Sequence, residues 1–434
     1  MKAIPKRFPS TIPDRAVGLM HSVDDYFDMM IQMELEFPHK LDPDRLAKAI
    51  DLTLDAEPVL GCRWVPHWRK PWWERLDTGE RRSFWPVNSK SKYEAFKSQK
   101  MDTSVGPQIK ACLWQSPDRD YLLLKVAHGV ADAAGVKDIC SEISCIYDRL
   151  ASDPGYRPEP NIEGSRGIWQ VLRHIPLYAY PRILLNYWQE TRCISNAKHG
   201  TYGLPVAGDP HGSLEFAYRS LSADAVSHLN GYGKARGATL NDVLLAAFIR
   251  ALGLRGDWNG RSRFLVIITV DLRQRYLPGR RAKGITNLAS NEYLDFGSTM
   301  DRDFDATLQR VVDRTQRRKA SWIGVHSWLT GLPYLLLVPH GWMSRAYRSL
   351  IMRAAAKNNV PLDFTNGGSI DPECVTFDHK PTSARLLAPS AYPPHLIVGL
   401  SGYAGTLTFS AGTYSSQKEV VDGFFDRLIY ELPK

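Results

Sequence analysis

The stretch Ala127-His128-Gly129-Val130-Ala131-Asp132-Ala133-Ala134-Gly135 joins an apolar run, YLLLKVA (121–127), to a segment with helical periodicity. The run is typical of an interior strand, and Val136 to Leu150 repeat apolar residues on one helical face. Small residues let the backbone turn tightly and allow a substrate to come close. His128 can accept a proton near neutral pH, and Asp132 can fix the geometry of the loop. A core histidine followed by a helix-capping aspartate would show the same local pattern, so both interpretations stay open.

The rest of the chain predicts further strands and helices around this connection. Asp42-Pro43 is typical of a helix start, and Thr239 with Asp242 resembles a capping box. Apolar spacing predicts the following elements: helices over 43–56, 240–252, 304–315 and 420–429, a strand over 264–270, strands within 108–127 joined by a turn at 116–120, and a hairpin over 395–414. This order predicts two α/β layers, each a sheet with helices.

Length and composition indicate an ordinary globular protein of two domains. The chain has 434 residues, of which 44% are hydrophobic and 23% are charged, and this excludes a disordered chain. Loose stretches at 153–165 and 198–213 place the boundary near residue 200. We therefore expect an N-terminal half over 1–200 and a C-terminal half over 201–434.

The chain is basic, with a formal net charge of +9 and a pI of about 9.1. This balance favours an anionic partner, which could be a nucleic acid, an anionic membrane or a phosphorylated cofactor. Nucleic-acid sites can combine basic and aromatic residues, as the stretch 67–73 does. This stretch is short and isolated, however, so it gives little support to nucleic-acid binding. Gly231 to Gly237 follows a helix-like stretch, as a turn between helices would, and lacks the dinucleotide-binding spacing. The sequence contains no H-E-x-x-H or C-x-x-C motif, so we expect no metal.

The six cysteines and the N-terminal residues indicate the redox compartment in which the protein is expected to work. Cys112, Cys140 and Cys145 lie in apolar periodic contexts, which predicts buried free thiols. Residues 1–15 contain no apolar core of a signal peptide, so a reducing cytoplasm fits the sequence.

One segment, Ala320 to Ser344, contains no charged residue and has basic residues on both sides. It is long enough to span a bilayer, but its glycines and prolines divide it into two pieces. Helices that are buried or line a cleft fit this pattern best, and contact with a membrane surface is the alternative.

Four motifs together resemble the acyl-CoA-dependent acyltransferase superfamily. This group includes condensation domains of nonribosomal peptide synthesis, alcohol acetyltransferases, wax ester synthases and plant-type acyltransferases. AHGVADA with Gly135 resembles their HHxxxDG motif, and three other segments resemble later motifs in the same order: TLNDVLLAAFIRAL (239–252), TVDLRQRYLP (269–278) and DFTNGGSI (363–370). The resemblance covers nearly the whole chain. It implies an α/β fold, an α+β sandwich of two chloramphenicol-acetyltransferase-like halves that form a pseudo-dimer with a tunnel between them.

The resemblance also implies an activity and a site. The expected reaction is acyl transfer from a pantetheine thioester, of coenzyme A or an acyl carrier protein, to an alcohol or amine, with no permanently bound cofactor. His128 would be the general base, while Asp132 and Arg273 would pair to hold the loop. The tunnel wall would include Asn366, Gly367 and Gly368. The expected partners are a small-molecule or lipid-like acceptor and an acyl carrier protein, for a cytoplasmic monomer that contacts membranes at most peripherally.

Two positions depart from the motif. Ala127 stands where the first histidine would be, and Ala133 stands where the glycine would be. The plant-type branch reads only HxxxD, and Gly135 could serve in place of the missing glycine. The departures leave a second interpretation open, a catalytically degenerate condensation-like protein that binds a partner.

Overall fold

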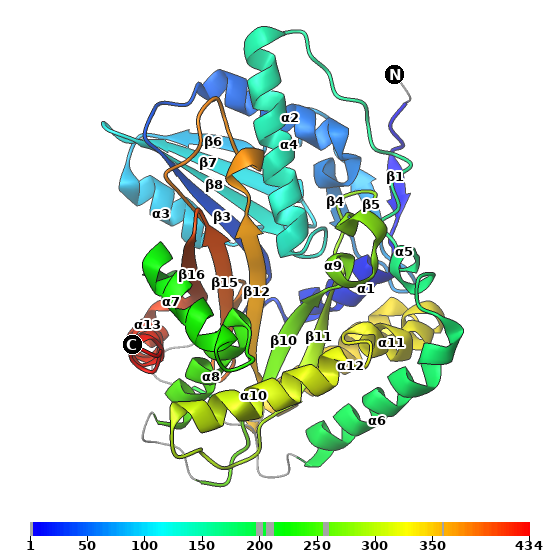
Figure 1. Ribbon diagram of the computed structural model, residues 1–434. Helices are drawn as coiled ribbons and strands as arrows, with labels where there is room; N and C mark the ends of the chain where they lie inside the picture. Colours follow the sequence, from blue (N-terminus) through cyan, green and yellow to red (C-terminus); the bar gives the residue numbers. More distant parts are fainter. Residues whose placement is uncertain (1–2, 197–202, 205–211, 255–259, 358–359) are drawn as a thin grey trace.

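The computed structural model describes residues 3–434 except for 197–202, 205–211 and 255–259 and the pair 358–359. Figure 1 shows one sheet in the upper part of the molecule, a second sheet below it, and a group of helices at the lower right. The expected boundary near residue 200 lies outside the described residues.

The first sheet has five strands, in the order β13 (Ser383–Leu387), β3 (Met30–Phe37), β8 (Asp120–Ala127), β7 (Ile109–Gln115) and β6 (Phe84–Val87). Alternate side chains of β7 and β8 face opposite sides, as the pleat of a strand requires. Leu113 and Leu122 lie in the core that includes α2 (Pro43–Ala56) and α4 (Ala133–Ser152). Cys112 and Leu123 pack instead against Tyr93 of α3 (Lys90–Ser98). Helices therefore cover both faces of this sheet.

The second sheet has eight strands, in the order β11 (Ala289–Asp295), β10 (Leu265–Asp271), β12 (Leu362–Ile370), β15 (Ile397–Tyr403), β16 (Thr406–Tyr414), β14 (Ser390–Ala391) and β2 (Phe27–Asp28), with β9 (Leu214–Leu221) also paired to β16. Phe248 of α8 (Leu240–Gly253) contacts Phe364 of β12 and Phe424 of α13 (Lys418–Tyr430), with ring centroids 5.1 and 5.5 Å apart. α7 (Ala223–Lys234) and α10 (Phe304–Lys319) pack beside α8. This core is the larger one of the molecule.

Each large sheet takes a strand from the opposite end of the chain. β13 belongs to the C-terminal half but pairs antiparallel with β3, from Ser383 opposite Glu36 to Leu387 opposite Gln32. β2 belongs to the N-terminal half but pairs with β14 of the second sheet. The two halves are therefore interlocked by strand pairing.

The remaining elements lie around these sheets. A small sheet joins β1 (Arg7–Pro9), β5 (Trp72–Arg75) and β4 (Cys62–Val65), next to α1 (Ile12–Gly18). The helices at the lower right of Figure 1 are α5 (Trp169–Leu172), α6 (Tyr180–Asn196), α11 (Val325–Leu337) and α12 (His340–Ala356), while α9 (Leu272–Tyr276) follows β10 directly. The part of the chain that the structure describes also contains six short 3-10 helices: η1 (Leu19–Val23), η2 (Pro58–Gly61), η3 (Leu177–Ala179), η4 (Pro278–Arg280), η5 (Pro372–Cys374) and η6 (Ser415–Gln417).

Several local predictions are confirmed. α2 begins after Asp42, whose carboxylate accepts the amides of Asp44 and Arg45, and the capping box of Thr239 and Asp242 is present. β15 and β16 form the predicted hairpin. The expected turn over Gly231 to Gly237 is only partly correct, because Gly231 to Lys234 form the last turn of α7 and the turn before α8 begins after them.

Two predictions need correction or refinement. Cys145 was expected to be buried but is exposed, because it lies one residue off the buried stripe that contains Ser144 and Ile146. The uncharged segment 320–344 forms α11 and the start of α12, and it leaves Leu337 81% exposed instead of burying it. Within the described residues, no helix is both long and apolar enough to cross a bilayer.

Candidate active site

His128 is the first residue after β8, in a loop that ends where α4 begins. The His128 amide donates to the carbonyl of Met29, the residue before β3, at 2.9 Å, and this bond anchors the start of the loop. The Val130 amide donates back to Ala127 at 3.0 Å and closes a tight turn. α4 starts at Ala133, two residues earlier than the predicted loop end, because the Asp132 side chain caps it.

The imidazole of His128 has a defined orientation. Its Nδ1 lies 3.1 Å from the carbonyl oxygen of Ala131. A carbonyl can only accept, so this contact favours the tautomer with its proton on Nδ1 and a lone pair on Nε2. Nε2 makes no hydrogen bond to any residue that the structure describes. Burial lowers the pKa of His128 below its usual 6.5, which favours the neutral ring. The side chain thus presents a basic nitrogen that is free to take a proton.

Asn287 contacts the same histidine from the second half of the chain. Its Nδ2 donates to the His128 carbonyl at 3.0 Å. The same Nδ2 lies 3.0 Å from Nδ1, but because the His128 carbonyl already accepts from it, this contact does not require a lone pair on Nδ1. The amide orientation is fixed because Oδ1 accepts the Ala289 amide at 3.2 Å. Sequence reasoning missed this residue. Asn287 lies 159 positions from His128, and nothing in its neighbourhood resembles a site motif.

The carboxylate of Asp132 points away from the imidazole and makes no hydrogen bond to it. Oδ1 accepts the Gly135 amide at 3.0 Å, and Oδ2 accepts the Leu288 amide and the Arg273 Nη1, both at 2.7 Å. The Asp132 and Arg273 side chains are only 5% and 3% exposed. Burial alone would raise the pKa of Asp132, but the Arg273 guanidinium and these donors lower it. Asp132 is therefore a buried carboxylate anion that ties the loop to the second sheet.

Arg273 reaches this carboxylate from α9, where it is the second residue after β10. The sequence placed it at a strand end, but a short helix begins there because Asp271 accepts the Arg273 amide at 2.9 Å. Nη2 donates to the Thr286 carbonyl at 2.5 Å. The guanidinium therefore joins the 286–288 segment to the loop that carries His128.

Gly135 and Gly367 are sites of close approach. A Cβ at Gly135 would lie 2.9 Å from the Ala131 Cβ and 3.2 Å from the Thr286 oxygen, so the first turn of α4 packs tightly on both. A Cβ at Gly367 would lie 3.3 Å from the Ala133 Cβ. The DFTNGGSI segment thus packs against the start of α4.

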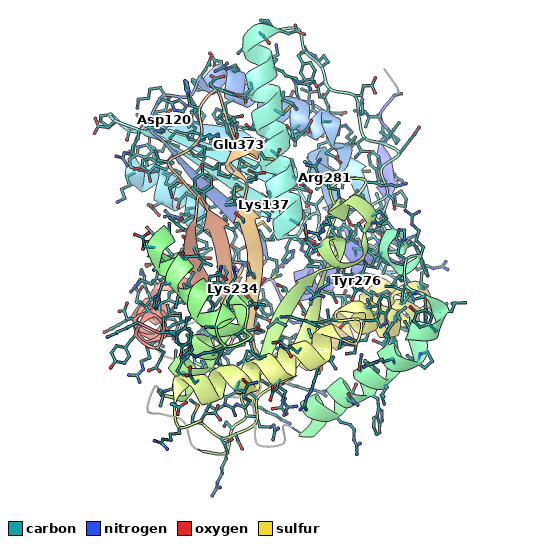
Figure 2. The ribbon with its side chains drawn as sticks, viewed as in Figure 1. Asp120, Lys137, Lys234, Tyr276, Arg281 and Glu373 are labelled. Atoms are coloured by element: carbon teal, nitrogen blue, oxygen red, sulfur yellow. The ribbon has the colours of Figure 1, made fainter. Side chains whose placement is uncertain are left out.

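The other residues of that segment take separate places. Gly368 has a φ of +74°, within the irregularity of the β12–β15 pairing. Lys137 of α4, labelled in Figure 2, donates to the carbonyls of Gly367 and Ser369 at 2.7 and 3.1 Å. The Asn366 side chain donates to Asn241 of α8 at 3.2 Å.

A second buried ion pair, which the sequence analysis did not predict, supports the segment that carries Asn287. Arg166 donates to both carboxylate oxygens of Asp14, at 3.0 and 2.8 Å. The same guanidinium donates to the Ile285 carbonyl at 2.7 Å, and the Thr286 hydroxyl donates to the Arg166 carbonyl at 2.7 Å. The segment that carries Asn287 is therefore held on both sides. Across the described ranges, no group of three or more His, Cys, Asp or Glu residues could hold a metal ion.

Comparisons with known proteins identify the fold that carries this site. No model of a known protein family matches the chain. One of the plipastatin synthase proteins from Bacillus subtilis (strain 168) is 25% identical over 211 residues. That match covers 46% of this chain but only 8% of the much longer relative.

Solved structures match over almost the whole chain. The TRI3 trichothecene 15-O-acetyltransferase from Fusarium sporotrichioides has a TM-score of 0.69 at 12% identity, covering 98% of this chain and 94% of that one. The first condensation domain of the CDA synthetase has a TM-score of 0.67 at 14% identity, with 98% and 95% covered. The EpoB cyclization-docking bidomain from Sorangium cellulosum has a TM-score of 0.67 at 17% identity, with 98% and 83% covered. The chain has the two-lobed fold of condensation domains, as its motifs predicted.

Proposed function

We propose that this protein is an acyltransferase that moves an acyl group from a pantetheine thioester to an alcohol or amine. The observation that carries the proposal is the state of His128. Its Nδ1 is held by Ala131, its Nε2 is unpartnered among the described residues, and burial lowers its pKa. A neutral imidazole with a free Nε2 is what a general base at neutral pH requires.

In the proposed reaction, Nε2 takes the proton of the acceptor hydroxyl or amine as the acceptor oxygen or nitrogen attacks the thioester carbonyl. The carbon–sulfur bond then breaks, and the imidazolium returns the proton to the leaving thiolate. Base catalysis of this kind contributes about 10²- to 10⁴-fold in rate. The donor and acceptor would meet in the expected tunnel between the lobes.

The surrounding residues would position the base. Asp132 and Arg273 fix the loop through their buried pair, and Asn287 holds the main chain of His128. Gly367 and Gly368 would line the tunnel beside the start of α4, and Gly135 lets that turn pack closely. Asn366 would act further out, since its side chain contacts Asn241.

The donor would be an acyl-CoA or the phosphopantetheine thioester of a carrier protein, because both end in the same pantetheine arm. Both are anionic, so basic residues near the tunnel entrance would favour them. The structural likeness to condensation domains supports a carrier-bound donor, and the likeness to an acetyltransferase supports a free one. A small or lipid-like acceptor and a monomeric enzyme complete the proposal.

A second function is favoured by the two departures from the motif. Ala127 is buried in β8, and Ala133 packs against Gly367. A protein that lost those motif residues could keep the fold and bind a thioester without transferring its acyl group.

One experiment separates the two functions. Purified protein is incubated with a panel of acyl-CoA and acyl-carrier donors and with alcohol and amine acceptors, and products are read by mass spectrometry. Transfer that falls at least ~100-fold in His128→Ala but persists in His228→Ala, an exposed histidine on α7, supports the enzyme. Full activity of folded His128→Ala would refute the mechanism. Thioester binding without transfer across the panel would favour the binding protein.

A further inference from the structure

The positive charge of the chain is concentrated in two segments. Residues 164–189 and 314–362 contain no Asp or Glu, although they make up about a sixth of the chain. They contain three and eight Lys or Arg residues, respectively. Because the chain's excess of positive charge is only nine, all of it lies in these segments and the remainder is slightly acidic.

The fold brings the two segments together. The first contains α5, η3 and the first part of α6, and the second contains the end of α10, then α11 and α12. α6 packs against α11, and the Asn186 amide donates to the Ser321 carbonyl at 2.6 Å. Figure 1 shows α6, α11 and α12 on the same side of the molecule. We call this side, formed by α5, η3, α6, α11 and α12, the basic helical face.

The α6 part of this face turns apolar side chains outward. Leu184, Leu185 and Trp188 are about half exposed, while the polar Asn186 is buried. A surface helix of a globular protein normally has the opposite arrangement. Just before it in the chain, Leu177 of η3 is 84% exposed.

α11 and α12 continue the apolar surface. Leu336 and Leu337 are exposed at the end of α11, and Leu350 is exposed on α12. Trp342 of α12 meets Trp68, with ring centroids 5.3 Å apart, and both indoles are exposed. Exposed apolar patches of this kind mark interaction surfaces.

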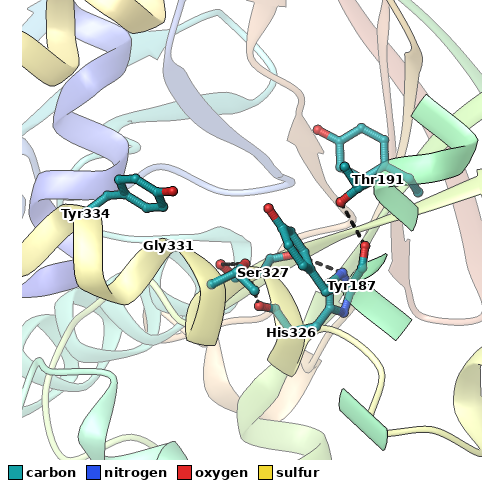
Figure 3. A pocket seen from close by; sticks show the side chains of 8 residues that line it. Tyr187, Thr191, His326, Ser327, Gly331 and Tyr334 are labelled. Carbon is teal, nitrogen blue, oxygen red and sulfur yellow. Dashed lines mark hydrogen bonds between the residues drawn. The ribbon is translucent and has the colours of Figure 1, made fainter. Parts of the chain in front are cut away.

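The two parts meet at a hollow. A hollow of about 280 Å³ lies between α6 and α11. Tyr187 of α6 and Tyr334 of α11 are among the residues that line it (Figure 3). One exposed tyrosine from each helix, Tyr187 and Tyr334, therefore borders the same opening.

We propose that the basic helical face docks on an anionic lipid bilayer. Exposed Leu and Trp side chains would enter the boundary between headgroups and acyl chains, where Trp and Tyr are favoured. Arg182, Arg345 and Arg353, which are exposed on the same helices, would meet lipid phosphates. The absence of acidic residues over both sequence segments fits an extended anionic plane better than a protein partner, whose surface carries both signs of charge. The proposal does not depend on the acyltransferase function.

The test is flotation of the full chain with vesicles of phosphatidylcholine alone or of phosphatidylcholine with phosphatidylglycerol. We expect recruitment to the anionic vesicles that weakens as salt is raised, since surface charges are screened. Two triple variants test the face: Arg182→Gln, Arg345→Gln with Arg353→Gln, and Leu185→Ser, Trp188→Ser with Leu337→Ser. Each should weaken the vesicle affinity on the order of 100-fold, since each surface cation contributes about 1 kcal/mol, or about fivefold, and buried apolar groups contribute similarly.

Two matched controls carry the same kinds of change elsewhere on the surface. Lys90→Gln with Lys234→Gln and Arg302→Gln removes three exposed cations, and Val105→Ser with Tyr430→Ser removes exposed apolar groups. Both should bind vesicles like the unchanged protein. Equal binding to neutral and anionic vesicles, or equal losses in test and control variants, would overturn the proposal. The proposal would also be overturned if light scattering showed self-association that the face variants abolish. A second copy of this chain would then be the occupant of the basic helical face.

Discussion

The buried pair of Asp132 and Arg273 should stabilise the whole protein, and its contribution follows from the contacts. Arg273→Met removes a charge-assisted hydrogen bond of 2.7 Å and leaves the Thr286 carbonyl without its donor. Asp132→Asn places an amide nitrogen against the Leu288 amide and the guanidinium, both of which are donors. With both side chains almost fully buried, each single change should lower the free energy of unfolding by about 3–5 kcal/mol. The double variant should be less destabilised than the sum, with a coupling energy of about 2 kcal/mol.

Urea denaturation followed by tryptophan fluorescence measures all four proteins at pH 7. Arg63→Met is the control, because its ion pair with Glu74 is half exposed and should contribute about 1 kcal/mol or less. Asp132 has a lowered pKa in the folded protein, so its contribution is present above the unfolded pKa of about 3.9. This contribution is lost as pH falls through the folded pKa of Asp132. The difference in unfolding free energy between the unchanged protein and Asp132→Asn should therefore become smaller in acid. Additive losses in the double variant, or a loss no larger than that of Arg63→Met, would refute this reasoning.

Three further results are expected. If His128 is the base, kcat/KM should fall as pH drops through an apparent pKa below 6.5, because protonation removes the Nε2 lone pair; an acid limb above that value would contradict this. Asn287→Asp should move that limb to higher pH, because a carboxylate about 3 Å from Nδ1 favours the imidazolium, whereas Asn287→Ala should lower kcat without such a move. Gly135→Ala should cost about 1–3 kcal/mol in urea denaturation, because its Cβ would lie 2.9 Å from another carbon. Gly231→Ala, in open space on α7, should be neutral or stabilising, and equal losses for the two glycines would contradict the packing.

Local physical chemistry made much of the fold predictable. α2 and α8 begin where their capping residues stand, since a side chain that accepts the first free amides defines a helix start within a few residues. The connection from β8 to α4 was predictable for the same reason, because an apolar strand, small residues and a capping aspartate follow each other directly. Cys145 shows the limit of such reasoning, since one position around a helix separates buried from exposed.

The site was predictable only where a resemblance supplied the long-range pairing. His128 and Asp132 stand in one motif, but the contact of Asp132 with Arg273 joins positions 141 residues apart. No local pattern encodes such a contact. Asn287 and the Arg166–Asp14 pair have no motif of their own, so only the folded chain reveals that they support the site. The outward leucines of α6 contradict ordinary helix patterning, and their direction also had to come from the structure.

The pairing of β13 with β3 has a consequence for how the protein is made. During synthesis β3 emerges about 350 residues before its partner β13. At about 5–20 residues per second, one edge of β3 stays unpaired for tens of seconds. An unpaired edge can pair with another nascent chain. The five-stranded sheet can be completed only after β13 has been synthesised, so aggregation should be sensitive to elongation rate and to chaperones that shield this edge.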